Sequence, residues 1–243
     1  MMDRALGAIS TGTTTAATTN QEAVNRFGMH YQWGRKDPFT PSITTAGWPG
    51  GEEVQIYNAT GNPITKGHYG IGTTDEEFKY DNTTITTIND LIQNPSTHYA
   101  KGDGTNNVPI ASATMPRGNK KGSLTPWWNP TIKTLYDPCP NGYRIPKSGT
   151  YGQASDWTIS NPYSGLTAGY TWKIESRASF FPASGHRSSS IGHFGAVGTS
   201  GNSWLTTLYD STYGYKLHFH SGAVDPINYY YRSEGLPVRC IID

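Results

Sequence analysis

Residues 201–243 read GNSWLTTLYDSTYGYKLHFHSGAVDPINYYYRSEGLPVRCIID, and this stretch carries the clearest structural signal in the chain. Polar and apolar side chains alternate over residues 214–220, which predicts a strand that buries Leu217 and Phe219 on one face. The polar side chains of the other face are Lys216, His218 and His220. Residues 229–231 are three consecutive tyrosines, and we interpret them as part of a loop. Tyrosine offers a large contact area at a low cost in rotamer entropy, so this stretch is typical of a recognition surface.

The composition indicates a compact domain that is rich in loops. The chain has 243 residues, with 28 Gly and 16 Pro that favour turns, and its 12% of aromatic residues can supply a core. Only 15% of the residues are charged and the formal net charge is +1, so nucleic-acid binding has little electrostatic support. No apolar stretch approaches the roughly 20 residues that span a bilayer, and we expect no membrane insertion.

Two short helices are expected in the first half of the chain. The pattern Thr-x-x-Glu at residues 19–22 is a capping box, which predicts a helix over residues 20–27 that ends at Gly28. A second helix is expected over residues 85–94, where Pro95 would end it. Strands are expected over residues 53–58, 170–174 and 180–187. The tryptophans expected in the core are Trp33, Trp127, Trp128, Trp157 and Trp172.

The chain has two cysteines, Cys139 and Cys240, which lie far apart in the sequence. In an oxidising compartment, a bridge between them would stabilise the fold by up to ~4.7 kcal/mol in the chain-entropy model. Two buried free thiols are the alternative, as is normal in a cytosolic protein. The residues alone leave both states open, although the final strand is expected to turn Cys240 and Val238 inward.

Four motifs in a fixed order carry a resemblance to a known family. They are residues 2–8 (MDRALGA), 31–39 (YQWGRKDPF), 136–146 (YDPCPNGYRIP) and 235–240 (GLPVRC). Together they resemble the major paralogous domain, which was first named in Fibrobacter and is abundant in surface proteins and fimbrial tip subunits of Bacteroides-type gut bacteria. The resemblance covers nearly the whole chain.

The resemblance implies an α+β class domain with a C-type-lectin-like fold, related to that of the formylglycine-generating enzyme. In this fold about two short helices pack on a small twisted antiparallel sheet with long irregular loops. It further implies a single domain over residues 1–243 and a disulfide between Cys139 and Cys240. Because the family often begins upstream of Met2, we expect the chain to be the C-terminal part of a larger extracellular protein, on a bacterial cell surface or a phage particle.

The related enzymes raise the question of catalysis, because they hold copper with a close pair of cysteines. The resemblance commits both cysteines here to the structural bridge, so we expect no enzyme. His218 and His220 have a spacing usable for a metal, with His186 and His193 as further ligands. We prefer a solvated polar strand face that contacts ligand. Calcium-loop spacing is also absent, and we expect neither a metal nor a cofactor.

A second, narrower resemblance concerns proteins whose variable residues are diversified by retroelements that mutate adenines. Asn codons then readily become codons for Tyr, Ser, Asp or His. Residues 225–232 (DPINYYYR) look like an Asn-rich family segment in which Asn has been replaced by Tyr. Ordinary drift in a surface loop is the alternative.

We therefore predict a non-enzymatic ligand-binding domain, an adhesin or receptor-binding domain, whose working surface lies within residues 201–243. The ligand would be a host or bacterial surface protein or a glycan, with pilus or virion subunits as further partners. The residues expected to contact the ligand are Tyr209, Asp210, Tyr213, His218, His220, Asp225, Asn228, Tyr229, Tyr230 and Tyr231. Trp204, half buried at the floor of the site, and Arg232 are expected to support them. The alternatives are a structural pilus tip or adaptor subunit without its own ligand, and a degenerate enzyme with a deep polar pocket.

Overall fold

The computed structural model describes two large parts of the chain, one at each end, and four short strands between them. The described residues are 1–10, 20–39, 41, 56–57, 63–64, 79–81, 97–99, 127–160, 163, 165–174, 177–189, 194–210 and 213–243. The helix expected over residues 85–94 and the candidate metal ligand His193 lie outside them. Among the described residues, no helix is long and apolar enough to cross a bilayer.

The order of helices and strands along the chain is as follows. The elements are α1 (Asn20–Phe27), β1 (His30–Gln32), β2 (Ile56–Tyr57), β3 (Pro63–Ile64), β4 (Lys79–Asp81), β5 (Thr97–Tyr99), β6 (Tyr143–Arg144), η3 (Ala154–Asp156), β7 (Trp157–Ile159), η4 (Gly165–Thr167), β8 (Gly169–Ile174), β9 (Arg177–Pro182), β10 (His186–Arg187), β11 (Phe194–Gly195), β12 (Ser200–Leu208), β13 (Tyr213–His220), β14 (Ala223–Tyr231), β15 (Gly235–Pro237) and β16 (Ile241–Ile242).

The expected α+β class is wrong, because the protein is mainly β. Strands make up 41% of the structure and helices 8%, and the strands form several small sheets. In the described part of the chain, α1 is the one α-helix. The physical reason lies in residues 200–231, which are rich in aromatic and β-branched side chains and which alternate between apolar and polar residues over 214–220.

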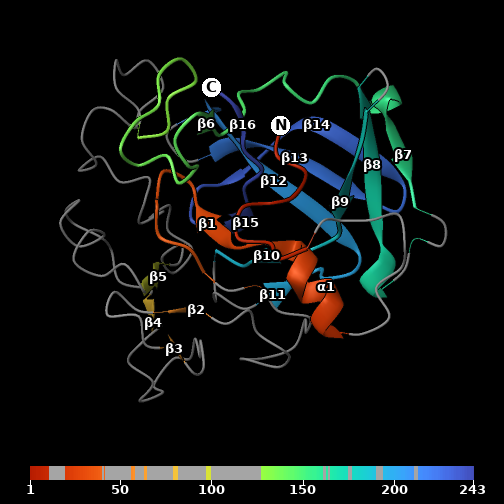
Figure 1. Cartoon of the computed structure of the whole chain (residues 1–243), viewed down its shortest axis with the longest axis horizontal. Helices are drawn as coiled ribbons and strands as arrows, with labels where there is room; N and C mark the ends of the chain where they lie inside the picture. The colour runs from red at the N-terminus through yellow and green to blue at the C-terminus, as the bar shows by residue number, and fades with distance from the viewer. Residues whose placement is uncertain are drawn as a thin grey trace.

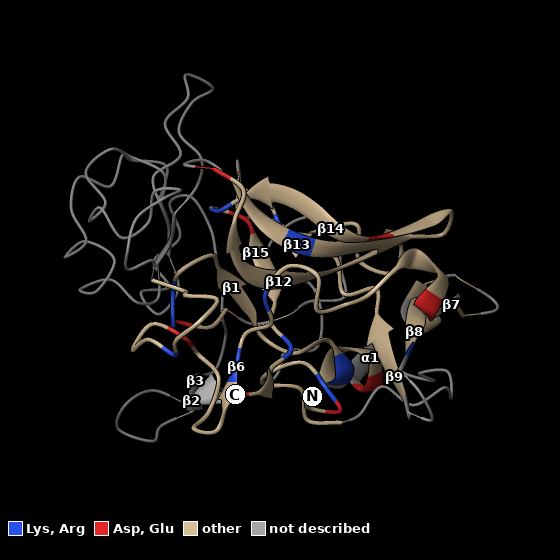
Figure 2. Cartoon of the chain, turned by 90° about the horizontal axis from the view of Figure 1, so that it is seen from above, with Lys and Arg blue, Asp and Glu red and all other residues tan. Residues whose placement is uncertain are grey.

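Three sheets build the part of the molecule that bears the predicted recognition segment (Figure 1). One has the order β12-β13-β14, the second β1-β15-β10-β11 and the third β7-β8-β9. Figure 2 shows β13 and β14 as the outer layer on one side of the molecule, with α1 and the N-terminus on the opposite side. β1, β12 and β15 lie between these two sides.

The helix predicted over residues 20–27 is confirmed as α1, and its apolar side chains are buried. Gly28 ends it with φ +74°, the left-handed conformation that glycine adopts without strain. A Cβ at this position would also lie 2.6 Å from the Cβ of Ala5 and 2.9 Å from the carbonyl oxygen of Leu6. The N-terminal segment therefore packs directly against the end of α1.

Aromatic residues supply the core, as the composition predicted. The first cluster includes Trp33, Trp128, Trp204, Leu236 and Val238. The second lies where β12, β13 and β14 meet the β7-β8-β9 sheet, and it includes Tyr151, Trp157, Trp172, Leu217 and Phe219. The five tryptophans expected in the core are all buried, and so are Leu217 and Phe219.

Two tryptophan indoles join β1 and β12 reciprocally. Trp204 on β12 donates from Nε1 to the carbonyl oxygen of Tyr31 on β1 at 2.7 Å. Trp33, which follows β1, donates from Nε1 to the carbonyl oxygen of Leu205 on β12 at 2.8 Å. Both indoles are fully buried, and a buried donor left without an acceptor would cost about 1–3 kcal/mol. The two bonds therefore set the position of the β12-β13-β14 sheet relative to β1.

The disulfide that the resemblance implied is confirmed between Cys139 and Cys240, whose Cα atoms are 5.9 Å apart. Cys240 and Val238 face inward, as predicted, and both are fully buried. Residues 238–240 lie between β15 and β16, and the N-terminal segment runs beside them, since Met2 donates its main-chain N–H to Cys240 O and Leu6 donates to Val238 O. The bridge therefore ties both ends of the chain to the corner at Cys139.

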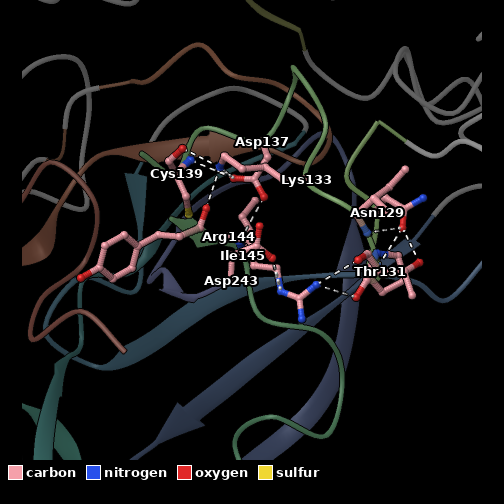
Figure 3. A network of polar contacts seen from close by, with 11 residues as sticks. Asn129, Thr131, Lys133, Asp137, Cys139, Arg144, Ile145 and Asp243 are labelled. Carbon is pink, nitrogen blue, oxygen red and sulfur yellow. Dashed lines mark hydrogen bonds and ion pairs between the residues drawn. The ribbon is translucent and has the colours of Figure 1, made fainter. Parts of the chain in front are cut away.

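A buried carboxylate organises that corner (Figure 3). Asp137 accepts hydrogen bonds from the main-chain N–H groups of Cys139 at 2.8 Å and Ile145 at 3.2 Å. The ammonium of Lys133 lies 3.2 Å from Asp137 Oδ1 and also donates to the carbonyl oxygens of Cys139 and Tyr143 at 2.6 and 2.7 Å. One ion pair thus holds together the loop that carries Cys139.

Removal of the disulfide is expected to destabilise the domain without changing its fold. The bridge closes a loop with a sequence separation of 101. A Cys139→Ser/Cys240→Ser variant should lose about 2–5 kcal/mol of unfolding free energy in urea denaturation. The wild type in excess dithiothreitol is the control and should show the same loss. Equal stability of the oxidised and reduced protein would contradict the prediction.

Asp137→Asn is expected to cost about 2–4 kcal/mol in the same denaturation measurement, because it leaves the Lys133 ammonium without its carboxylate. Asp243→Asn is the matched control. It removes the Arg144–Asp243 ion pair, 3.3 Å long and partly exposed, so its cost should be within about 1 kcal/mol. A similar loss from both variants would show that the corner does not depend on the buried carboxylate.

Candidate functional site

The three consecutive tyrosines lie in a strand, so their assignment to a loop was wrong. Residues 229–231 are the last three of β14, a nine-residue strand that pairs with β13. Tyrosine favours strands because its ring packs well against cross-strand neighbours. Turns lie on both sides of β14 instead, at residues 221–222 and 232–233.

Five tyrosine rings form one cluster at the end of the β12-β13-β14 sheet. The cross-strand pairs Tyr213–Tyr231 and Tyr215–Tyr229 place four of them on the same face. Tyr209, from the β12–β13 turn, stacks on Tyr229 with ring centroids 4.1 Å apart and planes 10° apart. It also meets Tyr215 edge-on at 5.5 Å, while Tyr213 and Tyr231 lie 4.8 Å apart. We call Tyr209, Tyr213, Tyr215, Tyr229 and Tyr231 the tyrosine cluster.

A tight turn positions the ring of Tyr209. The main-chain N–H groups of Tyr209 and Asp210 both donate to the carbonyl oxygen of Tyr213, at 3.1 and 3.2 Å. The carboxylate of Asp210 accepts the N–H of Tyr213 at 2.9 Å. Asp210, predicted as a ligand contact, therefore shapes the turn. The hydroxyls of Tyr213 and Tyr231 share a hydrogen bond, which raises the pKa of Tyr213 to about 12.

The cluster leaves an apolar surface open to solvent. Tyr229 is 45% exposed, and so is Ile227, two positions earlier in β14. Further along the same face, Leu217 and Phe219 are covered by the second core cluster. This sheet face is therefore buried at Leu217 and Phe219 and exposed to solvent at Tyr229.

Tyr230 points to the opposite face, where it covers a buried lysine. The ammonium of Lys216 lies 4.1 Å from the centroid of the Tyr230 ring and donates to Asn202 Oδ1 at 2.8 Å. Lys216 is only 5% exposed, and burial lowers its pKa to about 8. The sequence pattern placed Lys216 correctly on the polar face, but it did not reveal that this face is covered.

Two imidazoles and a carboxyl group surround Lys216. His218 Nδ1 lies 3.1 Å from Asn202 Oδ1, and His186 Nε2 lies 3.9 Å from Glu234 Oε2. Burial, and then the positive charge of Lys216, lower the pKa of both His186 and His218 to about 4. Burial raises the pKa of Glu234 to about 7, although Ser189 donates hydrogen bonds to it. His218, predicted as a ligand contact, therefore belongs to this polar cluster and not to the tyrosine surface.

The remaining predicted contacts, His220, Asp225 and Asn228, lie on β13 and β14 between Tyr229 and the turn at residues 221–222. His220 is exposed, and its Nδ1 accepts the N–H of Gly222 at 3.2 Å. Asp225 accepts hydrogen bonds from the side chain of Asn228 at 2.8 Å and from the N–H of Ile227 at 3.1 Å. These contacts shape the irregular end of the strand. In the described part of the chain, no three His, Cys, Asp or Glu side chains converge as a metal site would require.

Two predicted supporting residues are core residues. Trp204 is fully buried in the first core cluster, so its expected position at a half-exposed floor is wrong. Arg232 is 1% exposed, and its guanidinium carbon lies 5.7 Å from the centroid of a Trp33 ring. Burial lowers the pKa of Arg232 to about 10. Both residues position the sheet and neither reaches its outer surface.

Tyr215 was missed from the sequence, although the alternation of β13 would have placed it beside Tyr213. His186 and Glu234 were also missed as members of the polar cluster, since they reach Lys216 only through β10 and the turn before β15. The comparisons add no functional assignment, because no family model, curated protein or solved structure matches this chain.

The buried histidines predict a loss of stability in acid. The ordinary pKa of histidine is 6.5, but in the folded protein His186 and His218 titrate near 4, and burial lowers the pKa of His30 well below its ordinary value. Between these pH values the unfolded chain binds more protons, so stability falls as the pH falls. Glu234 opposes this, since its pKa of about 7 exceeds its ordinary 4.5 and the folded state binds the extra proton. The three histidines together bind more extra protons in the unfolded state than Glu234 binds in the folded state, so the net effect of acid is a loss of stability.

Urea denaturation between pH 7 and 5 should therefore show decreasing stability, with the fully buried His30 contributing up to about 1.4 kcal/mol per pH unit and the half-buried His186 and His218 contributing less. His186→Gln should make the dependence shallower, and Glu234→Gln should make it steeper. A stability that rises on acidification, or two variants with the same slope as the wild type, would contradict the assignment of these groups.

Proposed function

We propose that this chain is a non-enzymatic ligand-binding domain of an adhesin or receptor-binding protein, and that the tyrosine cluster is its contact surface. The observation that carries the proposal is the clustering of five tyrosine rings on a sheet face where Tyr229 is exposed, next to the part of that face where Leu217 and Phe219 are buried. Tyrosine is enriched where proteins bind other molecules, because its ring supplies contact area and its hydroxyl supplies a hydrogen bond.

The rigidity of the cluster supports the proposal. Each ring contacts at least one other ring, and four of the five side chains come from paired strands. Their rotamers are therefore restricted before a ligand arrives, which reduces the entropy that binding must overcome. A surface ordered in this way suits recognition, whereas a surface that only needed to be soluble would carry charged and mobile side chains.

The proposal extends to the setting of the protein. The disulfide fits an oxidising compartment, and the four ordered motifs favour a bacterial surface or phage protein of the major paralogous type. Diversification by a retroelement is part of the proposal, because Tyr229 and Tyr231 belong to neither of the two large core clusters. A template repeat and a reverse transcriptase gene beside the coding sequence would support it, and their absence would count against it.

Replacement of the exposed Tyr229 and the half-buried Tyr209 and Tyr213 is expected to abolish binding while the fold remains. We choose Tyr209→Ala/Tyr213→Ala/Tyr229→Ala and leave Tyr230 unchanged, because its ring covers Lys216. Ligands would first be identified for the wild type on arrays of glycans and of extracellular proteins. For each ligand the dissociation constant of the triple alanine variant should rise by about 100-fold or more.

Two matched variants separate recognition from folding. The corresponding triple phenylalanine variant keeps the rings and should remain within about tenfold of the wild type, since only hydroxyl contacts are lost. Leu135→Ala/Ile242→Ala removes apolar side chains that are 88% and 67% exposed elsewhere, and it should bind normally. Unchanged binding by the alanine variant would refute the proposal, and binding to pilus or virion subunits alone would assign the surface to assembly.

A further inference from the structure

We propose that the side chains of Lys216 and Asn202 join in an isopeptide bond between β13 and β12, with release of ammonia. Lys216 Nζ lies 2.8 Å from Asn202 Oδ1. Asn202 pairs with His218, two residues beyond Lys216, so the two side chains lie diagonally on the same face of neighbouring strands. This face is opposite to the tyrosine cluster, and the bond can form whether or not that cluster binds a ligand.

The two reacting groups are shielded from solvent. Lys216 and Asn202 are each 5% exposed, and the centroid of the Tyr230 ring lies 4.1 Å from the amine. Burial lowers the pKa of Lys216 to about 8, against the charges of Glu234 and Asp225. At pH 7 about a tenth of Lys216 is therefore the neutral amine. The neutral amine is the form that attacks a carbonyl carbon.

The amide of Asn202 is held in one orientation. Its Nδ2 donates to the carbonyl oxygen of Gly185 at 3.0 Å. His218 Nδ1 lies 3.1 Å from Asn202 Oδ1 and 3.4 Å from Ser200 Oγ. Because Oδ1 can only accept a hydrogen bond, we place the imidazole proton on Nδ1. This N–H stabilises the negative charge that develops on Oδ1 when the amine attacks.

A buried carboxyl group near the amine is suited to carry the proton. Glu234 is 2% exposed, and within the described residues its Oε2 has no hydrogen-bond partner, with His186 Nε2 at 3.9 Å. Of the two carboxyl groups whose charge acts on Lys216, Glu234 has a larger effect than Asp225. Burial raises the pKa of Glu234 to about 7, although hydrogen bonds from Ser189 oppose this. A group with a pKa near the ambient pH can both accept and donate a proton.

The reaction exchanges one amide for another, and no atom is oxidised or reduced. The lone pair of Lys216 Nζ forms a bond to Asn202 Cγ while the carbonyl electron pair moves onto Oδ1. Glu234 accepts a proton from Nζ and passes it to Nδ2. The carbonyl then re-forms, the Cγ–Nδ2 bond breaks and ammonia leaves. The products are a secondary amide and ammonia, and Glu234 returns to its starting state.

The bond fastens the strands that carry the tyrosine cluster. It closes a loop over residues 202–216, which includes Tyr209, Tyr213 and Tyr215. Unlike the disulfide between Cys139 and Cys240, an amide is not broken by reductants. β12 and β13 therefore stay joined when a reductant opens the disulfide.

Mass spectrometry of the reduced, denatured protein tests the bond. The wild type should lie about 17 Da, the mass of ammonia, below the mass that its sequence gives. Trypsin should leave residues 188–232 as one piece, because Lys216 is the one internal cleavage site of this segment and an acylated lysine is not cut. Chymotrypsin should then release a branched peptide that contains both Asn202 and Lys216. An undiminished mass, or cleavage after Lys216, would overturn the inference.

A different loss of ammonia is excluded by the same digest. A succinimide at Asn141–Gly142 would lower the mass equally, but it would leave Lys216 open to trypsin. A mass loss that maps to residues 141–142 would therefore also overturn the inference.

Three variants identify the groups that react. Lys216→Arg keeps the positive charge but lacks the amine, so it should show the undiminished mass. Glu234→Gln should form at least tenfold less of the linked species, whereas Asp225→Asn is the matched control and should link as the wild type does. Near-UV circular dichroism establishes that each variant is folded, and the wild type and Lys216→Arg decide the matter if Glu234→Gln is not. Mass loss in Lys216→Arg would overturn the bond, and full linkage in folded Glu234→Gln would overturn the role of Glu234.

Discussion

The reciprocal hydrogen bonds of Trp204 and Trp33 are the contact on which the rest of this structure depends. Each indole satisfies its donor on the main chain of the other's strand, at 2.7 and 2.8 Å, inside a fully buried cluster. Neither strand can move along the other without leaving a buried donor unpaired. The outer sheet therefore has one position on the molecule, and the face that carries the tyrosine cluster is held at the surface.

The disulfide and the hydrogen bonds of Asp137 hold the segment after β15 against the loop that carries Cys139. Cys240 follows β15, which pairs with β1, and Cys139 lies in the loop that Asp137 and Lys133 organise. β13 and β14 lie between the two cysteines in the chain, and they form the outer layer on one side of the molecule. In such an arrangement the outer side chains can be replaced at little cost to the core.

The two faces of β13 and β14 have different chemistry. One carries the tyrosine cluster, whose hydroxyls and rings are suited to contact with another molecule. The other carries Lys216 and His218, which lie near His186 of β10 and Glu234, and burial shifts the pKa values of all four groups. These groups pack beneath the sheet. We therefore expect the free energy of unfolding to depend on pH.

Local signals in the sequence predicted several elements correctly. The capping box and Gly28 predicted α1, the alternation of residues 214–220 predicted which side chains of β13 are buried, and tryptophans were correctly placed in the core. Tyr229–Tyr231 were misassigned because three consecutive tyrosines do not alternate with polar residues, although tyrosine itself favours strands.

The sequence by itself determined the features that depend on neighbours in the chain. These are the helix with its cap, the alternation of the strands, and the presence of the tyrosines and cysteines that later form the cluster and the disulfide. Tertiary structure alone decided which strand pairs with which. That pairing makes the protein mainly β, buries Trp204 and Arg232, and brings Tyr209 onto Tyr229 across a turn and a strand. The physical reason is that burial and ring stacking arise between residues distant in sequence, and their energies depend on the packing of whole sheets.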